Sequence, residues 1–267
     1  TVDRYYHHVQ KIETAAGLDD ISQVRLYFEP SYQQLSIHFI RIRRDGSLID
    51  VLRSSEIKVI QQEEGLDQQL YNGTLAAFVF LNDLRVGDIV DYAYTVSGEN
   101  PVFAGRYAEA LYLADGQPIH HLNFRLVWPS DRAIKIRNAN IGIEPKVTTA
   151  GNETEYIWER REVPAIDVED KTPAWFNPYP SVSLSEFQTW HDVVHWALPL
   201  YASSNPIPPD LLSKVRKWQA EFTTPEERTV AALRFVQDEI RYLGIELGRY
   251  SHQPTLPAKV FARRFGD

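Results

Sequence analysis

Hydrophobic and polar residues alternate with a period of two along much of the chain, from Val24 to about Tyr156. In Leu35–Phe39, for example, every second residue is apolar. Such alternation is typical of β-strands with one buried face. Arg44-Asp45-Gly46-Ser47 separates this strand from the apolar run Leu48–Leu52. An Asp-Gly pair in this setting predicts a two-residue type I′ hairpin, because both central positions need positive φ.

Further strand candidates follow, and turn residues such as Gly, Asn, Asp and Pro separate them. Many short strands at this spacing predict an antiparallel sandwich or layered sheet. No helical stretch interrupts them, so a parallel βαβ arrangement is not expected. The candidates are Ile57–Ile60, Ala76–Leu81, Ile89–Val96, Ala108–Leu113, His121–Trp128, Ala133–Ala139 and Glu155–Arg160.

The period changes to 3.6 in the last third of the chain, which predicts amphipathic helices. The third of these helices should end near Tyr242–Gly244. One of the four start signals is a capping box with proline at the first helical position. The expected starts are Ser185, Pro208-Pro209-Asp210, Thr224-Pro225-Glu226-Glu227 and Thr255.

These two periods predict an α+β protein with three parts. Residues 1–163 should form an N-terminal antiparallel β-sandwich-like domain, and residues 185–267 a mainly helical segment. Residues 164–184 read as a Pro-rich connector, because proline fixes φ and removes hydrogen-bond donors of a strand. Trp175 and Phe176 within it suggest that the connector lies against a domain surface.

Composition excludes several functions. The 267 residues carry a formal net charge of −8, so nucleic-acid binding is not expected. They contain no cysteine, which excludes disulfides, thiolate metal sites and a cysteine nucleophile within them. No apolar run approaches the roughly 20 residues that cross a bilayer. The N-terminus has neither a start Met nor a signal-peptide pattern, so we expect a mature or excised piece.

His191-Asp-Val-Val-His195 resembles a zinc-binding pattern, because two histidines four apart on a helix share one face. Glu221, on the next expected helix, could supply a third ligand. Asp192 is one methylene shorter than the Glu that activates water in the H-E-x-x-H motif. The alternative is an amphipathic helix with both histidines on its wet face and no metal.

Several stretches together resemble a known family. The chain resembles, over its whole length, bacterial transglutaminase-like proteins with an N-terminal β-rich domain of unknown function. The stretches occur in the order found in that family. They are Leu84–Tyr94, Asn100–Gly105, Leu126–Pro129, Tyr156–Trp158, Val163–Ala165, Ser185–Asp192 and Phe235–Tyr242.

The resemblance implies that residues 185–267 begin a papain-related core whose catalytic motif is Arg-x-Gly-Asp-Cys. Arg264-Phe-Gly-Asp267 matches its first four residues, so the catalytic Cys is expected directly after Asp267, with its His and Asp farther on. A thiolate at a helix N-terminus has a lowered pKa. Gly266 would allow close backbone approach, with Asp267 beside the cap. Tyr242 could donate to the oxyanion, or could simply pack at a helix end.

The same resemblance implies thiol acyl transfer on a protein or peptide amide by a Cys-His-Asp mechanism in the longer protein, without a cofactor. The residues given should be catalytically incomplete. Cross-linking, peptide cleavage and deamidation are not separated by these residues. Proteins of this kind are periplasmic, secreted or membrane-anchored, and any attachment would use regions outside this sequence.

A different class of function is a non-enzymatic module that binds envelope protein or glycan. Trp158, Trp175 and Phe176 could form an aromatic platform for such a ligand. Packing of these rings in a core is the alternative.

Overall fold

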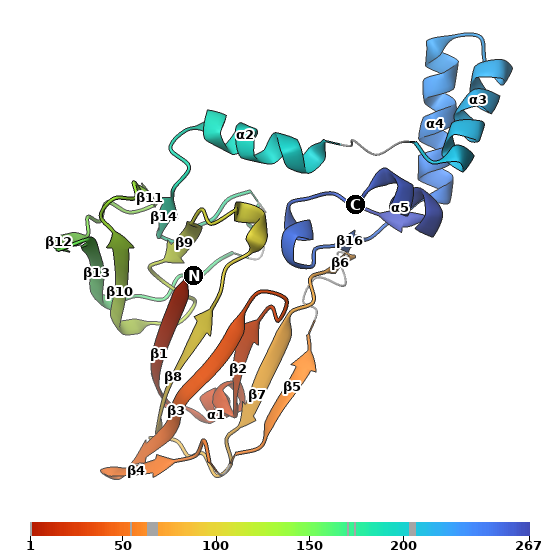
Figure 1. The fold of residues 1–267 in the computed structure, drawn as a ribbon. Coiled ribbons are helices and arrows are strands. Elements are labelled where there is room, and N and C mark those ends of the chain that lie inside the picture. The colour runs from red at the N-terminus through yellow and green to blue at the C-terminus, as the bar shows by residue number, and fades with distance from the viewer. Residues whose placement is uncertain (1, 54, 63–68, 170, 174, 203–206) are drawn as a thin grey trace. The chain divides into compact units, whose positions relative to one another are not determined.

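The computed structural model describes residues 2–53, 55–62, 69–169, 171–173, 175–202 and 207–267, apart from the side chain of Asp20 (Figure 1). Contacts divide the chain into two compact units. One comprises Thr1–Ala104 with Leu198–Asp267, and the other is Gly105–Ala197. The division at residues 163 and 185 stays a prediction. The described part is α+β and rich in antiparallel strands, as predicted, and it has no closed barrel.

The first unit contains two antiparallel sheets. Four strands pair in the order β1-β8-β3-β4 and three in the order β2-β7-β5. The first sheet consists of β1 (Asp3–Lys11), β8 (Ile89–Ser97), β3 (Gln34–Arg44) and β4 (Ser47–Asp50). The second consists of β2 (Gln23–Phe28), β7 (Leu75–Phe80) and β5 (Ile57–Gln61).

The predicted hairpin is confirmed between β3 and β4. Arg44 pairs with Ser47, and Asp45 and Gly46 have φ values of 47° and 78°. Positive φ at both positions is what a type I′ turn requires. The local sequence therefore sets the register of this pair.

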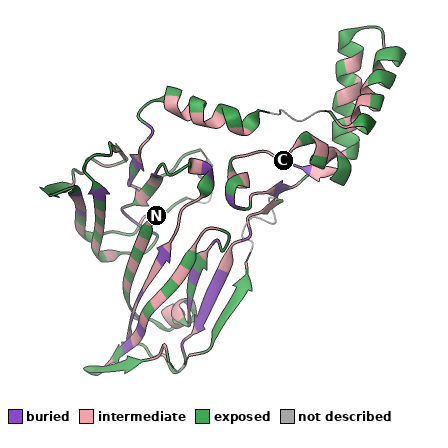
Figure 2. Cartoon of the chain, in the orientation of Figure 1, coloured by how far each residue is buried: buried purple, intermediate pink, exposed green. Residues whose placement is uncertain are grey.

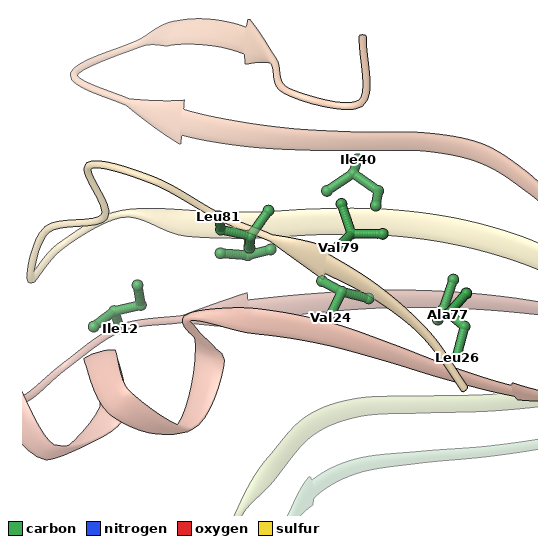
Figure 3. Close-up of a cluster of buried hydrophobic side chains, with 8 residues drawn as sticks. Ile12, Val24, Leu26, Ile40, Ala77, Val79 and Leu81 are labelled. Atoms are coloured by element: carbon green, nitrogen blue, oxygen red, sulfur yellow. The ribbon is translucent and has the colours of Figure 1, made fainter. Parts of the chain in front are cut away.

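One hydrophobic cluster joins both sheets (Figure 3). Val24 and Leu26 of β2 lie opposite Val79 and Ala77 of β7, so their period-two positions share the buried face. Helix α1 (Ala15–Ile21), capped by Thr14, packs against the cluster. The buried members are Ile12, Val24, Leu26, Ile40, Ala77, Val79, Leu81 and Val90.

Two carboxylates are buried near the start of β8. Asp88 accepts hydrogen bonds from Arg44, with Nη2 2.7 Å from Oδ2, and from the backbone of Arg85. Asp91 lies between Arg43 Nη2 at 2.6 Å and His7 Nε2 at 2.8 Å. The Arg44 hydrogen bonds lower the pKa of Asp88. Burial acts to raise the pKa of Asp91, but hydrogen bonds from Arg43 and His7 outweigh it and lower the pKa overall.

The second unit has two three-stranded antiparallel sheets, in the orders β10-β13-β12 and β11-β14-β9. The last strand of this unit, β14 (Ser181–Ser185), is central in its sheet, so residues 181–184 of the expected connector are in a strand. The other strands are β9 (Ala108–Tyr112), β10 (Ile119–Pro129), β11 (Lys135–Ala139), β12 (Lys146–Ala150) and β13 (Glu153–Val163).

The predicted cap at Ser185 is wrong, because Ser185 ends β14 and helix α2 (Trp190–Tyr201) starts later. Thr189 Oγ1 accepts from Asp192 N at 3.2 Å, and Asp192 Oδ2 accepts from Thr189 N at 2.8 Å. This reciprocal pair is a capping box with Asp in place of Glu. The box provides acceptors for the backbone N–H groups of Thr189 and Asp192 at the start of the helix.

The next two helices begin where the sequence predicts. They are α3 (Pro209–Glu221) and α4 (Pro225–Glu239), and the capping box of Thr224 and Glu227 is confirmed. Helix α4 ends before Tyr242, which is in a strand instead. The cap at Thr255 is wrong, because α5 (Pro257–Arg263) has Leu256 at its N-cap and no side-chain cap.

Short elements complete the first unit. They are β6 (Leu70–Tyr71), η2 (Pro101–Phe103), β15 (Arg241–Tyr242), β16 (Gly244–Ile245), η3 (Gly248–Ser251) and β17 (Phe265–Gly266). None of the helices in the described ranges has the length and hydropathy to cross a membrane.

Candidate functional site

The structure brings together Tyr242, Gly266 and Asp267, the three candidate support residues. Strands β15 and β17 pair in parallel, with Tyr242 opposite Gly266. Leu243 N donates to Gly266 O at 3.0 Å, one residue beyond the pair. Residues distant in sequence thus lie side by side directly after α5. The Tyr242 side chain is 56% exposed and available to a ligand.

Gly266 is buried and close to α5. A Cβ atom there would lie 2.5 Å from Val260 Cγ2, closer than real Cβ contacts come. Any larger residue would push β17 away from the helix. Glycine at this position therefore lets β17 pass close to α5.

Asp267 holds the segment that precedes α5. Its Oδ1 accepts from the Thr255 backbone N at 3.0 Å. Thr255 thus contributes a backbone donor in place of the predicted side-chain cap. This bond ties both ends of the α5 segment together.

Arg264 makes the turn between α5 and β17. Its φ of 65° is left-handed, and its carbonyl accepts from Arg241 N at 2.8 Å. Its guanidinium carbon lies 4.6 Å from the ring centre of Phe261 and 5.2 Å from that of Phe235. These cation–π contacts hold a strained residue in place. Sequence reasoning assigned Arg264 to the motif, but its conformation and its stacking depend on distant residues.

An open, mainly apolar pocket of about 440 Å³ lies beside Asp267. It could receive apolar side chains of a substrate or of further polypeptide. Its walls come from the end of α2, from α3, α4 and α5, and from the segment before α5. The lining residues include Tyr201, Trp218, Phe235, Val236, Thr255 and Phe261.

A second, more polar pocket of about 330 Å³ lies where the β-rich residues meet the segment after β16. Glu29 and Tyr32 line it from one side, and Glu246 and Ser251 from the other. Burial, and then the nearby Glu29 charge, raise the pKa of Tyr32. The hydroxyl of Tyr32 therefore stays protonated at neutral pH.

His191 and His195 lie on one face of α2, with ring centres 4.0 Å apart. His195 Nδ1 lies 3.1 Å from the His191 carbonyl oxygen and is hydrogen-bonded to it. Asp192 serves the capping box, and hydrogen bonds from Thr189 lower its pKa. Glu221 belongs to the other compact unit. Among the described residues, no group of three His, Cys, Asp or Glu could hold a metal.

Trp158 packs in a core, the alternative to an aromatic platform, because it is fully buried and stacks on Tyr156. Trp175 and Phe176 are 84% and 49% exposed, with ring centres 6.1 Å apart. These two rings do not pack in a core. The expectation that they lie against a domain surface is not met by Trp175.

Asn100 links two segments that lie far apart in the sequence. Its Nδ2 donates to Gly248 O and to Ser251 Oγ, both at 2.9 Å. It belongs to a stretch that carries the family resemblance, and this was the available signal. Its partners lie about 150 positions away in the chain, at separations of 148 and 151 residues, so no local pattern reveals them.

Comparison with known proteins establishes the fold and the family. A crystal structure of a "putative protease" from Parabacteroides distasonis ATCC 8503 matches with a TM-score of 0.77 at 12% identity. The match covers 99% of this chain and 52% of the other, so the chain spans about half the length of that protein. At this identity the likeness concerns the fold alone.

No curated protein matches the chain, and the family comparison gives no transglutaminase-like match. Residues 1–167 match DUF3857, described as a domain of unknown function with a solved structure. These residues are more than half of the sequence. The chain therefore belongs to the DUF3857 family.

Proposed function

We propose that these residues are the N-terminal part of a transglutaminase-like thiol acyl-transfer protein that acts on a protein or peptide amide. The observation that carries the proposal is the pairing of Tyr242 with Gly266, directly after α5 and directly before Asp267. In the family that the sequence resembles, the nucleophilic cysteine follows the Gly-Asp pair. The 267 residues contain no cysteine, so the nucleophile would lie outside them.

In the proposed reaction, the cysteine thiolate attacks the amide carbonyl carbon and forms an oxyanion. The Tyr242 hydroxyl would donate a hydrogen bond to this oxyanion. The C–N bond then breaks, the amine leaves with a proton from the catalytic His, and a thioester remains. Water or a second amine attacks the thioester, the C–S bond breaks, and the thiol is regenerated.

Two further observations support this proposal. The solved structure of the same fold is described as that of a "putative protease", and it is about twice as long as this chain. The 440 Å³ pocket beside Asp267 is open and apolar, as expected for a core that further polypeptide would cover. An envelope location belongs to the same proposal and rests on the resemblance.

The test uses a protein extended beyond Asp267 through the expected Cys, His and Asp. Hydroxylamine trapping of an acyl-enzyme from a peptide amide should give a product that the Cys→Ser variant does not form. Tyr242→Phe should lower the acylation rate about 100-fold, as loss of one oxyanion donor does. Tyr5→Phe is the matched control, because Tyr5 is a strand tyrosine of similar exposure, 60%. Trapping that survives Cys→Ser would refute the proposal.

A second candidate is the binding of envelope protein or glycan, favoured by the exposed ring pair Trp175 and Phe176. Exposed aromatic rings of this kind stack on sugars and apolar side chains. The 267-residue chain should then bind on a glycan or peptide array, and Trp175→Ala should abolish the signal. Equal binding by the wild type and the variant would reject this site.

A further inference from the structure

We propose that the β-rich residues 1–104 align the candidate active-site strand, and that Asn100 is the positioning residue that fastens it. The catalytic meaning of this inference rests on the proposed function, whereas its structural content does not. It assigns a positioning role to part of the region, residues 1–167, that matches the family.

The first step concerns the segment Arg241–Glu246, whose backbone donors alternate between two partners. Arg241 N and Leu243 N donate to Arg264 O and Gly266 O, at 2.8 and 3.0 Å. Gly244 N and Glu246 N donate to Gln69 O and Tyr71 O, at 2.9 and 2.7 Å. Successive residues of an extended strand point their N–H groups to opposite edges. The segment is therefore the middle strand between β17 and β6.

The second step is energetic. Strands β15 and β17 pair over only two residues each. An isolated two-stranded ribbon is marginal in water, and a third strand is normally needed for stability. Strand β6 supplies that third strand, and β6 and β16 lie side by side in Figure 1. Gly244 and Leu70 are close together, because a Cβ at Gly244 would be 2.7 Å from Leu70 Cδ2.

The third step is the fastening beyond β16. Asn100 uses both ends of its amide. Its Oδ1 accepts from Val102 N at 3.0 Å and caps η2, while its Nδ2 donates to Gly248 O and Ser251 Oγ of η3. Phe103 stacks edge-on against His252, with ring centres 5.0 Å apart. The turn after β8 thus holds the end of the strand that carries Tyr242.

It follows that residues 69–71 and Asn100 set the position of Tyr242 relative to Gly266. Weakening the hydrogen bonds from Asn100 to η3 should destabilise the middle strand and, through it, the pairing of that strand with β17. Because Asn100 touches neither Tyr242 nor Gly266, its effect on the site is positional.

The experiment is hydrogen exchange by mass spectrometry on the 267-residue chain. Asn100→Asp keeps the acceptor that caps η2 and removes both donated bonds. Exchange should rise roughly tenfold, as loss of such bonds implies, in Gly244–Ser251 and also in Arg241–Leu243 and Phe265–Asp267. Ser251→Ala, a milder change, should give the same pattern with smaller amplitude. The matched control is Asn140→Asp, which removes a 2.7 Å bond from Nδ2 to Asn177 O in the other unit. It should leave these segments unchanged.

Two results would overturn the inference. One is faster exchange in Gly248–Ser251 with no change in Arg241–Leu243, which would show that the strand is not coupled to Asn100. The other is a uniform rise that includes β3 and β7, which would show a general loss of stability. Neither readout uses catalysis, so failure here and failure of the acyl-transfer test are distinguishable.

Discussion

The strands of the first unit and the helices α3, α4 and α5 carry similarly regular apolar patterns. They differ in how far the apolar side chains are buried. Ile40 and Val79 are 0% exposed, whereas Leu233 and Val236 of α4 are 54% and 53% exposed. None of the residues of α3, α4 and α5, all of which the structure describes, is buried. Figure 2 shows this contrast between the strands and the helices. A periodic pattern identifies the face that is suited to burial, but burial itself depends on a partner.

The largest expected effect tests this contrast directly. Ile40→Ala should lower the free energy of unfolding by about 3 kcal/mol, because it leaves a cavity in a closed core. Leu233→Ala removes a side chain of the same size from an exposed helix face, and should change stability by less than about 0.5 kcal/mol. Urea denaturation followed by tryptophan fluorescence measures both.

Equal losses of unfolding free energy in the two variants would contradict the contrast between the buried strands and the exposed helices. They would mean that the α4 face is covered in solution, for example by association of chains. Sedimentation at several concentrations would then show whether the wild type self-associates more than the Leu233→Ala variant.

The second effect concerns the charges that hold the β-rich region. The Arg44 hydrogen bonds depress the pKa of Asp88, so its stabilising contribution is complete above the unfolded value of about 3.9. That contribution is lost as the pH falls through the lower folded value. Asp88→Asn should cost about 2 kcal/mol at pH 7. The difference from wild type should shrink toward pH 2.

The control is Asp131→Asn, an exposed aspartate in a turn. It should stay within about 0.5 kcal/mol of wild type at every pH. Urea midpoints between pH 2 and pH 7 provide the measurement. A constant difference between Asp88→Asn and wild type across this range would contradict the role given to the ionised carboxylate.

Local signals in the sequence predicted much of the fold. Asp45-Gly46 defined the hairpin, and Thr224 with Glu227 defined the start of α4, because each acts within a few residues. Strand β14 was missed although its apolar residues Val182 and Leu184 alternate with serines, since prolines precede it. Ser185 resembles a cap because it precedes the apolar positions of the helix, whereas Thr189 forms the actual capping box with Asp192.

The candidate site was only partly predictable. Gly266 and Asp267 came from the resemblance, and so did the choice of Tyr242, but their pairing depends on contacts between distant segments. The left-handed Arg264 and the double use of Asn100 depend on partners that become neighbours only on folding. Periodicity and capping rules describe single elements, so they carry no information on such partners.

A smaller effect is expected at the start of α4. A helix without a buried face depends more on its caps, because packing contributes little. Thr224→Ala removes the Oγ1 acceptor of Glu227 N and should cost about 1 kcal/mol of local stability. Hydrogen exchange of the first turn of α4 should rise about fivefold. Gln237→Ala, at an exposed position near the other end of the same helix, is the control and should leave this turn unchanged. If both variants exchange alike, the cap does not stabilise α4 in the way proposed.

The smallest effect on stability is expected from the addition of a metal ion. Helix α2 also has no buried residue, and a bound zinc ion would be another way to stabilise it. His191 and His195 supply two ligands on one face, and the described residues offer no third that would complete a group of three. One equivalent of Zn²⁺ should therefore leave the melting temperature unchanged. A specific site filled at 100 times its Kd would add about 2.7 kcal/mol. A rise of several degrees that His195→Ala abolishes would establish the zinc site and show that α2 is held by metal and not by packing.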